Sequence, residues 1–352
     1  MRPVSSTSKI GGCGMSEFRK DPLSDHWVII APNRAERPEQ FGLGSLERST
    51  GRCPFCRGHE ADTPAQTAAY SATGRLIDQG PWQVRVIPNK FPAVENVREQ
   101  RPEQRDFFRS RHGVGVHEVI IECPDHVTAF SHLSDQQISL VFQAYRDRMA
   151  YWRGDPRLAY AQIFKNSGAS AGASLEHAHS QLIATPVVPT QIENELVRSA
   201  DYFQQHGRCV FCEMIRRELA DPIRLVEQTE QFVAFCPFAS QFPYETWILP
   251  RQHGSHFEFT EDGRLVGLAV MLRKILGRME HLLNDPGFNY LIHTAPFGST
   301  HLSHYHWHVE ILPRVSNTAG FEWGAGDYIN MVTPEQAAHV LRFGREPDGR
   351  QT

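Results

Sequence analysis

The sequence predicts an α+β protein whose two halves follow the same plan. Each half carries, in the same order, a Cys-x-x-Cys pair, a strand-like run, a single histidine, an amphipathic helix, a second strand and a His-x-His segment. The single histidine precedes the His-x-His segment by 51 residues in the first half (126 to 177) and by 53 in the second (253 to 306). Strand, crossover helix and strand in each half favour two pseudo-symmetric lobes, each with its own antiparallel sheet.

The first half supplies the better defined elements. Strands are expected at 27–30, 84–87, 115–121 and 160–165. Apolar side chains at helical spacing predict a helix between the last two strands; they are Ile138, Val141, Phe142, Tyr145 and Met149. Ser134 is expected to begin this helix in a capping box with Gln137.

The second half repeats this arrangement. Strands are expected at 244–249 and 288–293, and the helix between them is indicated by Leu265, Leu268, Leu272, Ile275 and Met279. A helical stretch at 191–206 follows the proline-bounded link 186–189, and Pro334 is expected to open a short helix.

Length and composition fit a protein of two domains. A chain of 352 residues with 40% hydrophobic content can bury a substantial core. We predict a flexible N-terminus at 1–15, an N-terminal lobe at 16–190, a C-terminal lobe at 191–345 and a tail at 346–352. The net charge of -4 offers no basic field for nucleic acid, and no run has the length of a membrane span or the character of a signal peptide. We therefore expect a cytoplasmic protein, in keeping with unpaired cysteines.

The two Cys-x-x-Cys pairs predict zinc sites. Neither pair has a second one close behind it, so the remaining ligands must be distant residues, and histidine is the obvious donor type. The repeated plan assigns Cys53, Cys56, His126 and His177 to one zinc, and Cys209, Cys212, His253 and His306 to the other. Closed sites of this kind are structural. The alternatives are redox pairs or histidines buried for packing, and at the second site His293, His301, His304 and His308 compete with His306.

The segment His177-Ala-His179-Ser-Gln181 predicts catalytic chemistry. Alternate residues of a strand share one face, so both imidazoles and the carboxamide would face one site. The preceding loop, 166–174, is Gly, Ala and Ser after Asn166, and its backbone N–H groups can approach phosphate oxygens. If His177 binds zinc, a neutral His179 is left to attack phosphorus, and Gln181 could donate to a non-bridging oxygen. A merely structural role for Gln181 is the alternative.

Three further segments are weaker candidates. Arg34 and Arg37 follow the first predicted strand and could bind phosphate, although surface arginines are common. Asn89 lies in a turn and could contact a base or ribose. The glycines at 320, 324 and 326 form either a substrate loop or a plain connection.

Taken together, these motifs resemble the galactose-1-phosphate uridylyltransferase family of the histidine-triad superfamily, including its ADP-sugar phosphorylase-like branch. The resemblance runs from about Phe18 to Leu341 and keeps the order of the family's motifs. It implies histidine-triad-like lobes and a nucleotidylated His179 with Gln181 as its phosphate partner. It also implies the first metal site and contacts from Asn89 and from Asn166, Gly172 and Ser174 of the loop to nucleoside or phosphate. Members of the family are commonly homodimers, so the resemblance implies a homodimer here.

The reaction implied is exchange of a nucleoside monophosphate between a nucleoside-diphosphate sugar and a sugar 1-phosphate, with ping-pong kinetics. Galactose-1-phosphate uridylyl transfer, a step of galactose metabolism, is the first expectation. The alternatives are an ADP-sugar phosphorylase, a zinc-stabilised nucleotide-binding module, or a hydrolase of the same superfamily. The chain departs from the uridylyltransferase pattern in having Ala178 between its histidines and Lys90 after Asn89. It also lacks a clear Tyr-Glu pair for galactose, and the second cysteine pair is more similar to the ADP-sugar branch.

Overall fold

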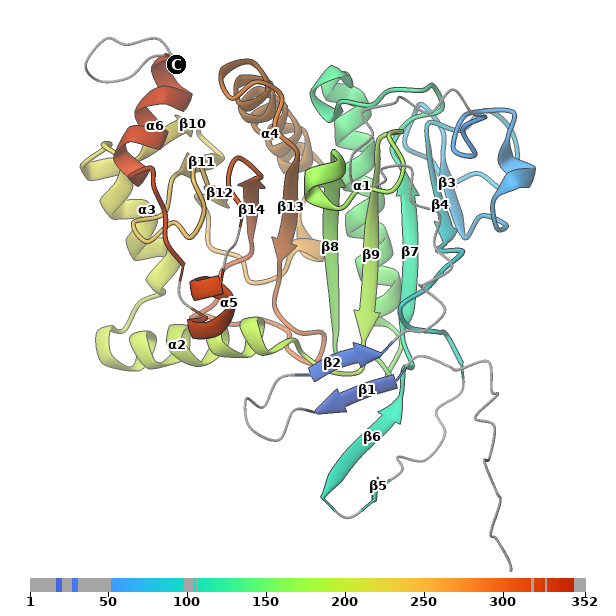
Figure 1. Cartoon of the computed structure of the whole chain (residues 1–352), viewed down its shortest axis with the longest axis horizontal. Helices are drawn as coiled ribbons and strands as arrows, with labels where there is room; N and C mark the ends of the chain where they lie inside the picture. Colours follow the sequence, from blue (N-terminus) through green and yellow to red (C-terminus); the bar gives the residue numbers. More distant parts are fainter. Residues whose placement is uncertain are drawn as a thin grey trace, which may run out of the picture.

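The computed structural model describes residues 17–20, 27–30, 52–97, 104–105, 107–317, 320–326 and 328–344. In this part of the chain the fold is α+β, as predicted, and is dominated by one antiparallel sheet with helices against it (Figure 1). None of the described helices is long and apolar enough to cross a membrane. Arg34 and Arg37 lie outside the described residues.

The main sheet has ten strands, and every neighbouring pair is antiparallel. Their order across the sheet is β10 (Leu225–Gln228), β11 (Phe232–Phe235), β12 (Thr246–Pro250), β14 (His308–Pro313), β13 (Phe288–His293), β8 (Tyr160–Ser167), β9 (His179–Thr185), β7 (Val116–Ile121), β4 (Val84–Pro88) and β3 (Ala68–Tyr70). A smaller sheet has the order β2 (Trp27–Ile30), β1 (Glu17–Lys20), β6 (Phe108–His112) and β5 (Gln104–Arg105).

The order of the ten strands is symmetric about the contact between β8 and β13. Each of these two strands follows the long helix of its half, and β9 and β14, which carry the His-x-His segments, occupy matching places on either side. We expected a separate sheet in each half, but β8 and β13 pair directly from Ile163–Ile292 to Ser167–Phe288. An unpaired edge strand leaves backbone N–H and C=O groups without partners, and this pairing satisfies both edges at once.

Two long helices cover one face of this sheet. They are α1 (Asp135–Arg153) and α4 (Asp262–Leu282), which pack against each other behind the sheet in Figure 1. The apolar positions predicted for both helices are buried and belong to a single core cluster drawn from both halves. Burial of each such side chain contributes about 1.5–3 kcal/mol, so this shared core holds the halves together.

The other described helices lie around the second half, and they are α2 (Thr190–His206), α3 (Val210–Ala220), α5 (Gly320–Ala325) and α6 (Pro334–Phe343). Short 3-10 turns occur in both halves, at Glu60–Asp62, Phe130–His132, Ala169–Ala171 and Phe257–Phe259. The capping box predicted at α1 is incomplete. Ser134 accepts a hydrogen bond from the Gln137 backbone N–H, but the Gln137 side chain donates to the carbonyls of Gln83 and Glu122 instead. A complete capping box occurs at Thr333 and Gln336 of α6.

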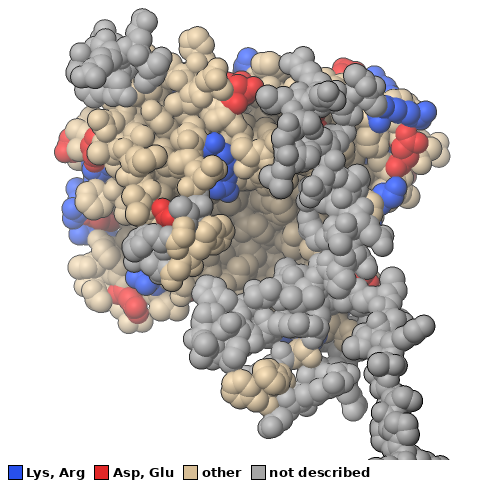
Figure 2. All heavy atoms as spheres, viewed as in Figure 1, with Lys and Arg blue, Asp and Glu red and all other residues tan. Residues whose placement is uncertain are grey.

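Strand parity decides which face carries the candidate site. Ser180 of β9 faces the helices, because its hydroxyl lies 2.6 Å from the Tyr145 hydroxyl of α1. His179 and Gln181 therefore face the other way. That opposite face is hollowed near its centre (Figure 2). His177 was expected in the same strand, but β9 begins only at His179, so His177 stands just before it.

Candidate active site and metal centres

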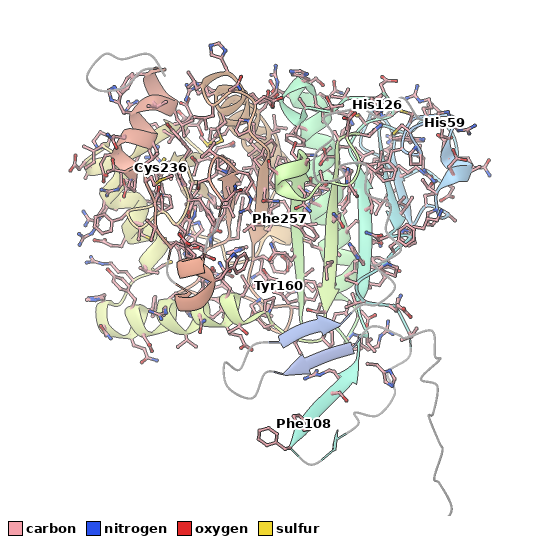
Figure 3. The ribbon with its side chains drawn as sticks, viewed as in Figure 1. His59, Phe108, His126, Tyr160, Cys236 and Phe257 are labelled. Carbon is pink, nitrogen blue, oxygen red and sulfur yellow. The ribbon has the colours of Figure 1, made fainter. Side chains whose placement is uncertain are left out.

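Cys53, Cys56, His126 and His177 form the first predicted cluster. Their ligand atoms all lie within 4.8 Å of one another. The Cys53 and Cys56 sulfurs stand 3.5 and 3.6 Å from His177 Nδ1, and Cys56 Sγ stands 3.5 Å from His126 Nδ1. Zinc bonds to sulfur and nitrogen at a tetrahedral angle would separate the two atoms by about 3.6 Å. His126 lies at the outer end of this half, near His59, whose Nδ1 is 2.6 Å from the Cys53 carbonyl oxygen (Figure 3).

The imidazole of His177 is prepared for a metal. Its Nε2 is 2.9 Å from the Cys123 carbonyl, which fixes the Nε2–H tautomer and leaves Nδ1 to face the thiols. Burial lowers the pKa of His177 to about 4, so the ring is neutral at pH 7, as a ligand must be. Burial and the adjacent Cys53 raise the pKa of the Cys56 thiol to about 11, so binding must displace its proton.

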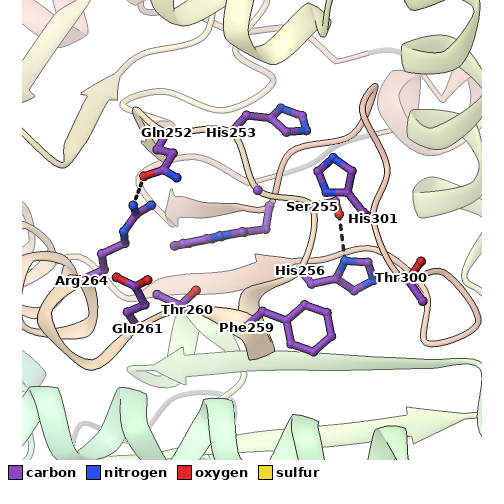
Figure 4. Close-up of a pocket in the computed structure, with 12 residues that line it drawn as sticks. Gln252, His253, Ser255, His256, Phe259, Thr260, Glu261, Arg264, Thr300 and His301 are labelled. Atoms are coloured by element: carbon purple, nitrogen blue, oxygen red, sulfur yellow. Dashed lines mark hydrogen bonds between the residues drawn. The ribbon is translucent and has the colours of Figure 1, made fainter.

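Cys209, Cys212, His253 and His306 form the second predicted cluster with the same geometry. Cys212 Sγ lies 3.4 Å from His253 Nδ1 and 3.6 Å from His306 Nδ1, and His253 Nε2 is 3.0 Å from the Leu302 carbonyl. Both clusters could hold a metal ion. The competing histidines are not members of this group: His293 and His308 belong to a different one, and His301 lines a cavity of 200 Å³ together with His253 (Figure 4). His304 is in none of the described clusters.

A third cluster was not predicted. Glu195 of α2, His293 of β13 and His308 and Glu310 of β14 bring their side-chain ligand atoms within 4.8 Å of one another. His293 Nδ1 stands 3.0 Å from a Glu195 oxygen. Although burial lowers it, the pKa of His293 is raised to about 9 by Glu310 and Glu195. The repeat did contain a signal for this group, since His308 and Glu310 occupy the places of His179 and Gln181 in the second half.

His179 opens β9 beside a cavity of 220 Å³. Its Nδ1 is 2.8 Å from the His177 carbonyl oxygen, so Nδ1 carries the proton and Nε2 carries the lone pair. The Phe55 ring packs edge-on at 5.3 Å. The cavity combines an apolar wall with a few polar groups, the usual composition of a small-molecule site. Its lining includes Phe55, Ile87, Phe91, Val119, Leu175, Asn89, Ser174, His179 and Gln181.

The carboxamide of Gln181 is held by two neighbours. Its Oε1 accepts hydrogen bonds from His117 Nε2 at 2.8 Å and from Asn89 Nδ2 at 3.3 Å. Because the Ala93 backbone N–H donates to His117 Nδ1 at 3.0 Å, the proton of the His117 ring is on Nε2. The oxygen of Gln181 is therefore occupied, and its amide N–H groups are directed elsewhere. The sequence did not reveal His117, which lies two residues into a buried strand and belongs to no motif.

The Gly/Ala/Ser loop leaves β8 and is supported by the second half of the chain. Asn289 of β13 donates to Asn166 Oδ1 at 2.8 Å and to the Ala171 carbonyl at 2.9 Å, and it accepts from Arg314 Nε at 2.6 Å. Gly172 has a φ of +82°, a conformation that favours glycine. Ser174 lines the cavity beside His179, whereas Gly172 does not.

The glycines at 320 and 324 lie in α5, and Gly326 follows it. The next segment is fastened to the second half: the Tyr328 ring packs 5.1 Å from Phe242, and Asn330 Nδ2 donates to the Ser240 carbonyl at 3.0 Å. The segment after α5 is thus held against the second half at Tyr328 and Asn330.

Comparison with known protein families agrees with this arrangement. Residues 12–189 match the N-terminal domain of galactose-1-phosphate uridyl transferase, and residues 195–347 match its C-terminal domain. The chain belongs to the galactose-1-phosphate uridyl transferase family. Membership makes it an enzyme of a family that acts on nucleotide sugars.

Two curated members of this family align over almost their whole length. ADP-glucose phosphorylase of Arabidopsis thaliana is 37% identical over 97% of this chain and 98% of its own. Galactose-1-phosphate uridylyltransferase of Thermotoga maritima is 30% identical over 93% of this chain and 98% of its own.

Solved structures extend the same comparison. An ADP-glucose phosphorylase from Arabidopsis thaliana with bound ADP-glucose superposes with a TM-score of 0.73 at 35% identity, covering 93% of this chain and 99% of that one. A uridylyltransferase superposes with a TM-score of 0.77 at 27% identity, covering 93% and 97%.

Proposed function

We propose that this protein transfers a nucleoside monophosphate from a nucleoside-diphosphate sugar to a phosphate-bearing acceptor, with His179 as a covalent carrier. The observation that carries the proposal is the tautomer of the His179 ring and its place beside the cavity. Its Nδ1–H is held by the His177 carbonyl at 2.8 Å, so the lone pair is on Nε2, beside a cavity with polar and apolar walls. A neutral imidazole held in this way is a competent nucleophile.

In the first step, Nε2 of His179 attacks the α-phosphorus in line. The bond from phosphorus to the bridging oxygen breaks, and the sugar 1-phosphate leaves with the electron pair. In the second step, a phosphate oxygen of the acceptor attacks the same phosphorus, and His179 leaves with its lone pair restored. Two displacements of this kind exchange one pyrophosphate bond for another without free water.

Gln181 is proposed to stabilise the α-phosphate during both steps. Since its Oε1 is held by His117 and Asn89, its N–H groups are the part left for a non-bridging oxygen. Asn89, which we had expected to contact the base or ribose, supports this orientation and also lines the cavity. Backbone N–H groups of the loop from Asn166 to Ser174 would supply further donors. Arg34 and Arg37, which lie outside the described residues, are still proposed to bind phosphate.

We propose zinc for both Cys₂His₂ clusters. The donor set and the spacing of the sulfur and nitrogen atoms fit a tetrahedral ion with no open position. Such an ion would stabilise the chain around His177 rather than take part in the reaction. Because His177 would be one of its ligands, the first ion would also hold in place the His177 carbonyl that orients His179.

For the nucleotide we propose adenine, so that the donor is an ADP-sugar and the acceptor is inorganic phosphate or a sugar 1-phosphate. The sequence alone had favoured uridylyl transfer to galactose 1-phosphate. Support for the adenylyl alternative comes from the relative at 37% identity, which is named an ADP-glucose phosphorylase, against 30% for a uridylyltransferase. A homodimer remains part of the proposal, and sedimentation velocity would test it.

The deciding experiment is intact mass after brief incubation with ADP-glucose, UDP-glucose or UDP-galactose in turn. The pH is kept neutral to basic, because a phosphoramidate is labile in acid. With ADP-glucose we expect a mass gain of one adenylyl group, which is AMP less one water, and no gain for His179→Ala. Addition of UMP alone would replace the adenine proposal by uridylyl transfer. An adduct that persists in His179→Ala would refute His179 as the carrier.

A chase of the isolated adduct identifies the acceptor. Release of ADP by inorganic phosphate would mark a phosphorylase, whereas regeneration of an ADP-sugar by glucose 1-phosphate or galactose 1-phosphate would mark a transferase. Loss of AMP in buffer alone, at a rate that neither acceptor changes, would instead indicate a hydrolase.

A further inference from the structure

A buried ion pair lies directly behind the nucleophile, on the helix-facing side of the sheet. Lys165 of β8 and Glu122, just after β7, are 1% and 0% exposed, and the Lys165 Nζ stands 2.6 Å from Glu122 Oε2. The second carboxylate oxygen accepts from the Tyr145 hydroxyl of α1 at 3.0 Å. Tyr145 in turn contacts the hydroxyl of Tyr290 in β13 at 2.5 Å, so the network joins both halves of the chain.

The ammonium group of Lys165 makes a second contact, to the backbone of His179. It donates to the His179 carbonyl oxygen at 2.9 Å. Successive carbonyls of a strand point to opposite sides, and the Ala178 carbonyl accepts from the Glu122 N–H beside β7. The His179 carbonyl therefore points towards β8. The ladder between β8 and β9 ends at the pair Phe164–Gln181, before it reaches His179. Lys165 thus donates to this carbonyl just beyond the end of the ladder.

Stability alone does not account for this arrangement. Two charges lose their hydration on burial, and apolar side chains of similar volume often give equal or greater stability. An apolar pair could fill the same space between the sheet and α1, but it could not donate to the His179 carbonyl. The contact that distinguishes the charged pair from an apolar one is therefore the contact with the nucleophilic residue.

We propose that Lys165, held in place by Glu122, is a positioning residue for His179. The pair fixes the carbonyl of His179, while the His177 carbonyl fixes its imidazole Nδ1. The backbone and the ring are then held from opposite faces of the sheet, and Nε2 is kept on the line of attack. Displacement of a reacting atom by about 1 Å can slow a reaction about a hundredfold. This inference rests on the proposed function for its kinetic consequence, but its structural consequence can be measured without any substrate.

The test uses a variant that removes both charges together. A single substitution would leave one buried charge unpaired and threaten folding. In Lys165→Met with Glu122→Gln, the methionine keeps the length of lysine without its donor, and the amide oxygen introduced by Glu122→Gln can still accept from Tyr145. Tyr290→Phe is the matched control, because it removes a hydroxyl from the same network without touching His179. If the double variant does not fold, Lys165→Arg keeps the charge and displaces the donor.

Two measurements decide the outcome. Hydrogen exchange of the peptide spanning 175–184 should be faster in the double variant and unchanged in Tyr290→Phe. The single-turnover rate of adduct formation at saturating donor should fall tenfold or more, with the KM for the donor and the metal content unchanged. Unchanged exchange, or faster exchange with an undiminished rate, would overturn the proposal. If the parent protein forms no adduct, the proposed function fails instead, and exchange alone decides whether the pair positions His179.

Discussion

At the scale of single residues, two equivalent positions of the repeat differ in surroundings between the two halves. His179 and Gln181 line a cavity, whereas His308 and Glu310 are buried in an acidic cluster with His293 and Glu195. The His308 ring is fully buried and stacks 4.9 Å from Trp247. At this pair of positions, therefore, His179 lines a cavity, whereas His308 has no exposed surface.

The orientation of Gln181 gives a prediction at this scale. His117→Phe removes the shorter of the two hydrogen bonds to Gln181 Oε1 and leaves only that from Asn89, so the carboxamide can turn more easily and present its oxygen to the phosphate. We expect kcat to fall about tenfold, less than the hundredfold or more expected for Gln181→Ala, which removes the donor itself. Steady-state kinetics of both variants would check this ranking. Equal activity of His117→Phe and the parent would show that Gln181 needs no support.

A second prediction at this scale concerns the second Cys₂His₂ cluster. Cys209→Ser should release about one equivalent of metal, because it removes one of four ligands, and it should lower the stability of the second half. Cys236→Ser is the control, since this buried cysteine lies in none of the described clusters. Elemental analysis of the purified variants gives the metal content. Identical metal content in all three proteins would remove the second site.

At the scale of elements, β13 of the second half supports the Gly/Ala/Ser loop of the first. Asn289 hydrogen-bonds both Asn166 and the Ala171 carbonyl, and Gly287 lies against the turn at Gly168. A Cβ on Gly287 would overlap the Ser170 hydroxyl and stand 3.0 Å from the Ser167 carbonyl oxygen. The close approach of two backbones thus requires glycine at this position.

Gly287→Ala should therefore push the loop away from β13. We expect a loss of about 1–3 kcal/mol in the free energy of unfolding, together with slower adduct formation, since the loop carries Asn166 and Ser174. Gly263→Ala is the control, because a Cβ there would meet no atom within 4 Å. Urea denaturation and single-turnover mass spectrometry provide the two readouts. If Gly287→Ala and Gly263→Ala changed the free energy of unfolding equally, the steric explanation would be contradicted.

At the scale of the whole molecule, the cluster of Glu195, His293, His308 and Glu310 holds α2 against the sheet. Glu195 of α2 contacts His293 at 3.0 Å and accepts from the Tyr305 hydroxyl at 2.8 Å, while Glu310 and His308 face the same histidine from β14. Burial opposes both charges, but the ion pair outweighs it: the pKa of His293 is raised to about 9 and that of Glu195 is lowered to about 2.

These shifts predict a pH dependence for the attachment of α2. The contribution of His293 is complete below its ordinary pKa near 6.5 and is lost as the pH rises through about 9. The contribution of Glu195 is complete above its ordinary pKa near 4.5 and is lost as the pH falls through about 2. Stability should therefore decline between pH 7 and 10 in the parent. Melting curves should show a smaller decline in Glu195→Gln, and an identical one would contradict the assignment.

The sequence was sufficient for the two long helices and for the two groups of candidate metal ligands, but β1, β3, β10, β11 and α3 were not predicted from it. Apolar spacing predicted both long helices, because burial of one helical face leaves a 3.6-residue pattern. The repeat predicted both groups of metal ligands, because the same local plan encodes each. The incomplete capping box at Ser134 was missed, because the Gln137 side chain is recruited by carbonyls distant in sequence.

By itself, the sequence determined which residues repeat, which faces are apolar and which cysteines and histidines could be metal ligands, since these depend on residue type and local spacing. Tertiary structure alone decided how the halves meet. The pairing of β8 with β13, the support of Gln181 by His117, the cluster around His293 and the contact of Lys165 with His179 all join residues from different elements. Such contacts depend on strand register and on packing across the sheet, which no local pattern records.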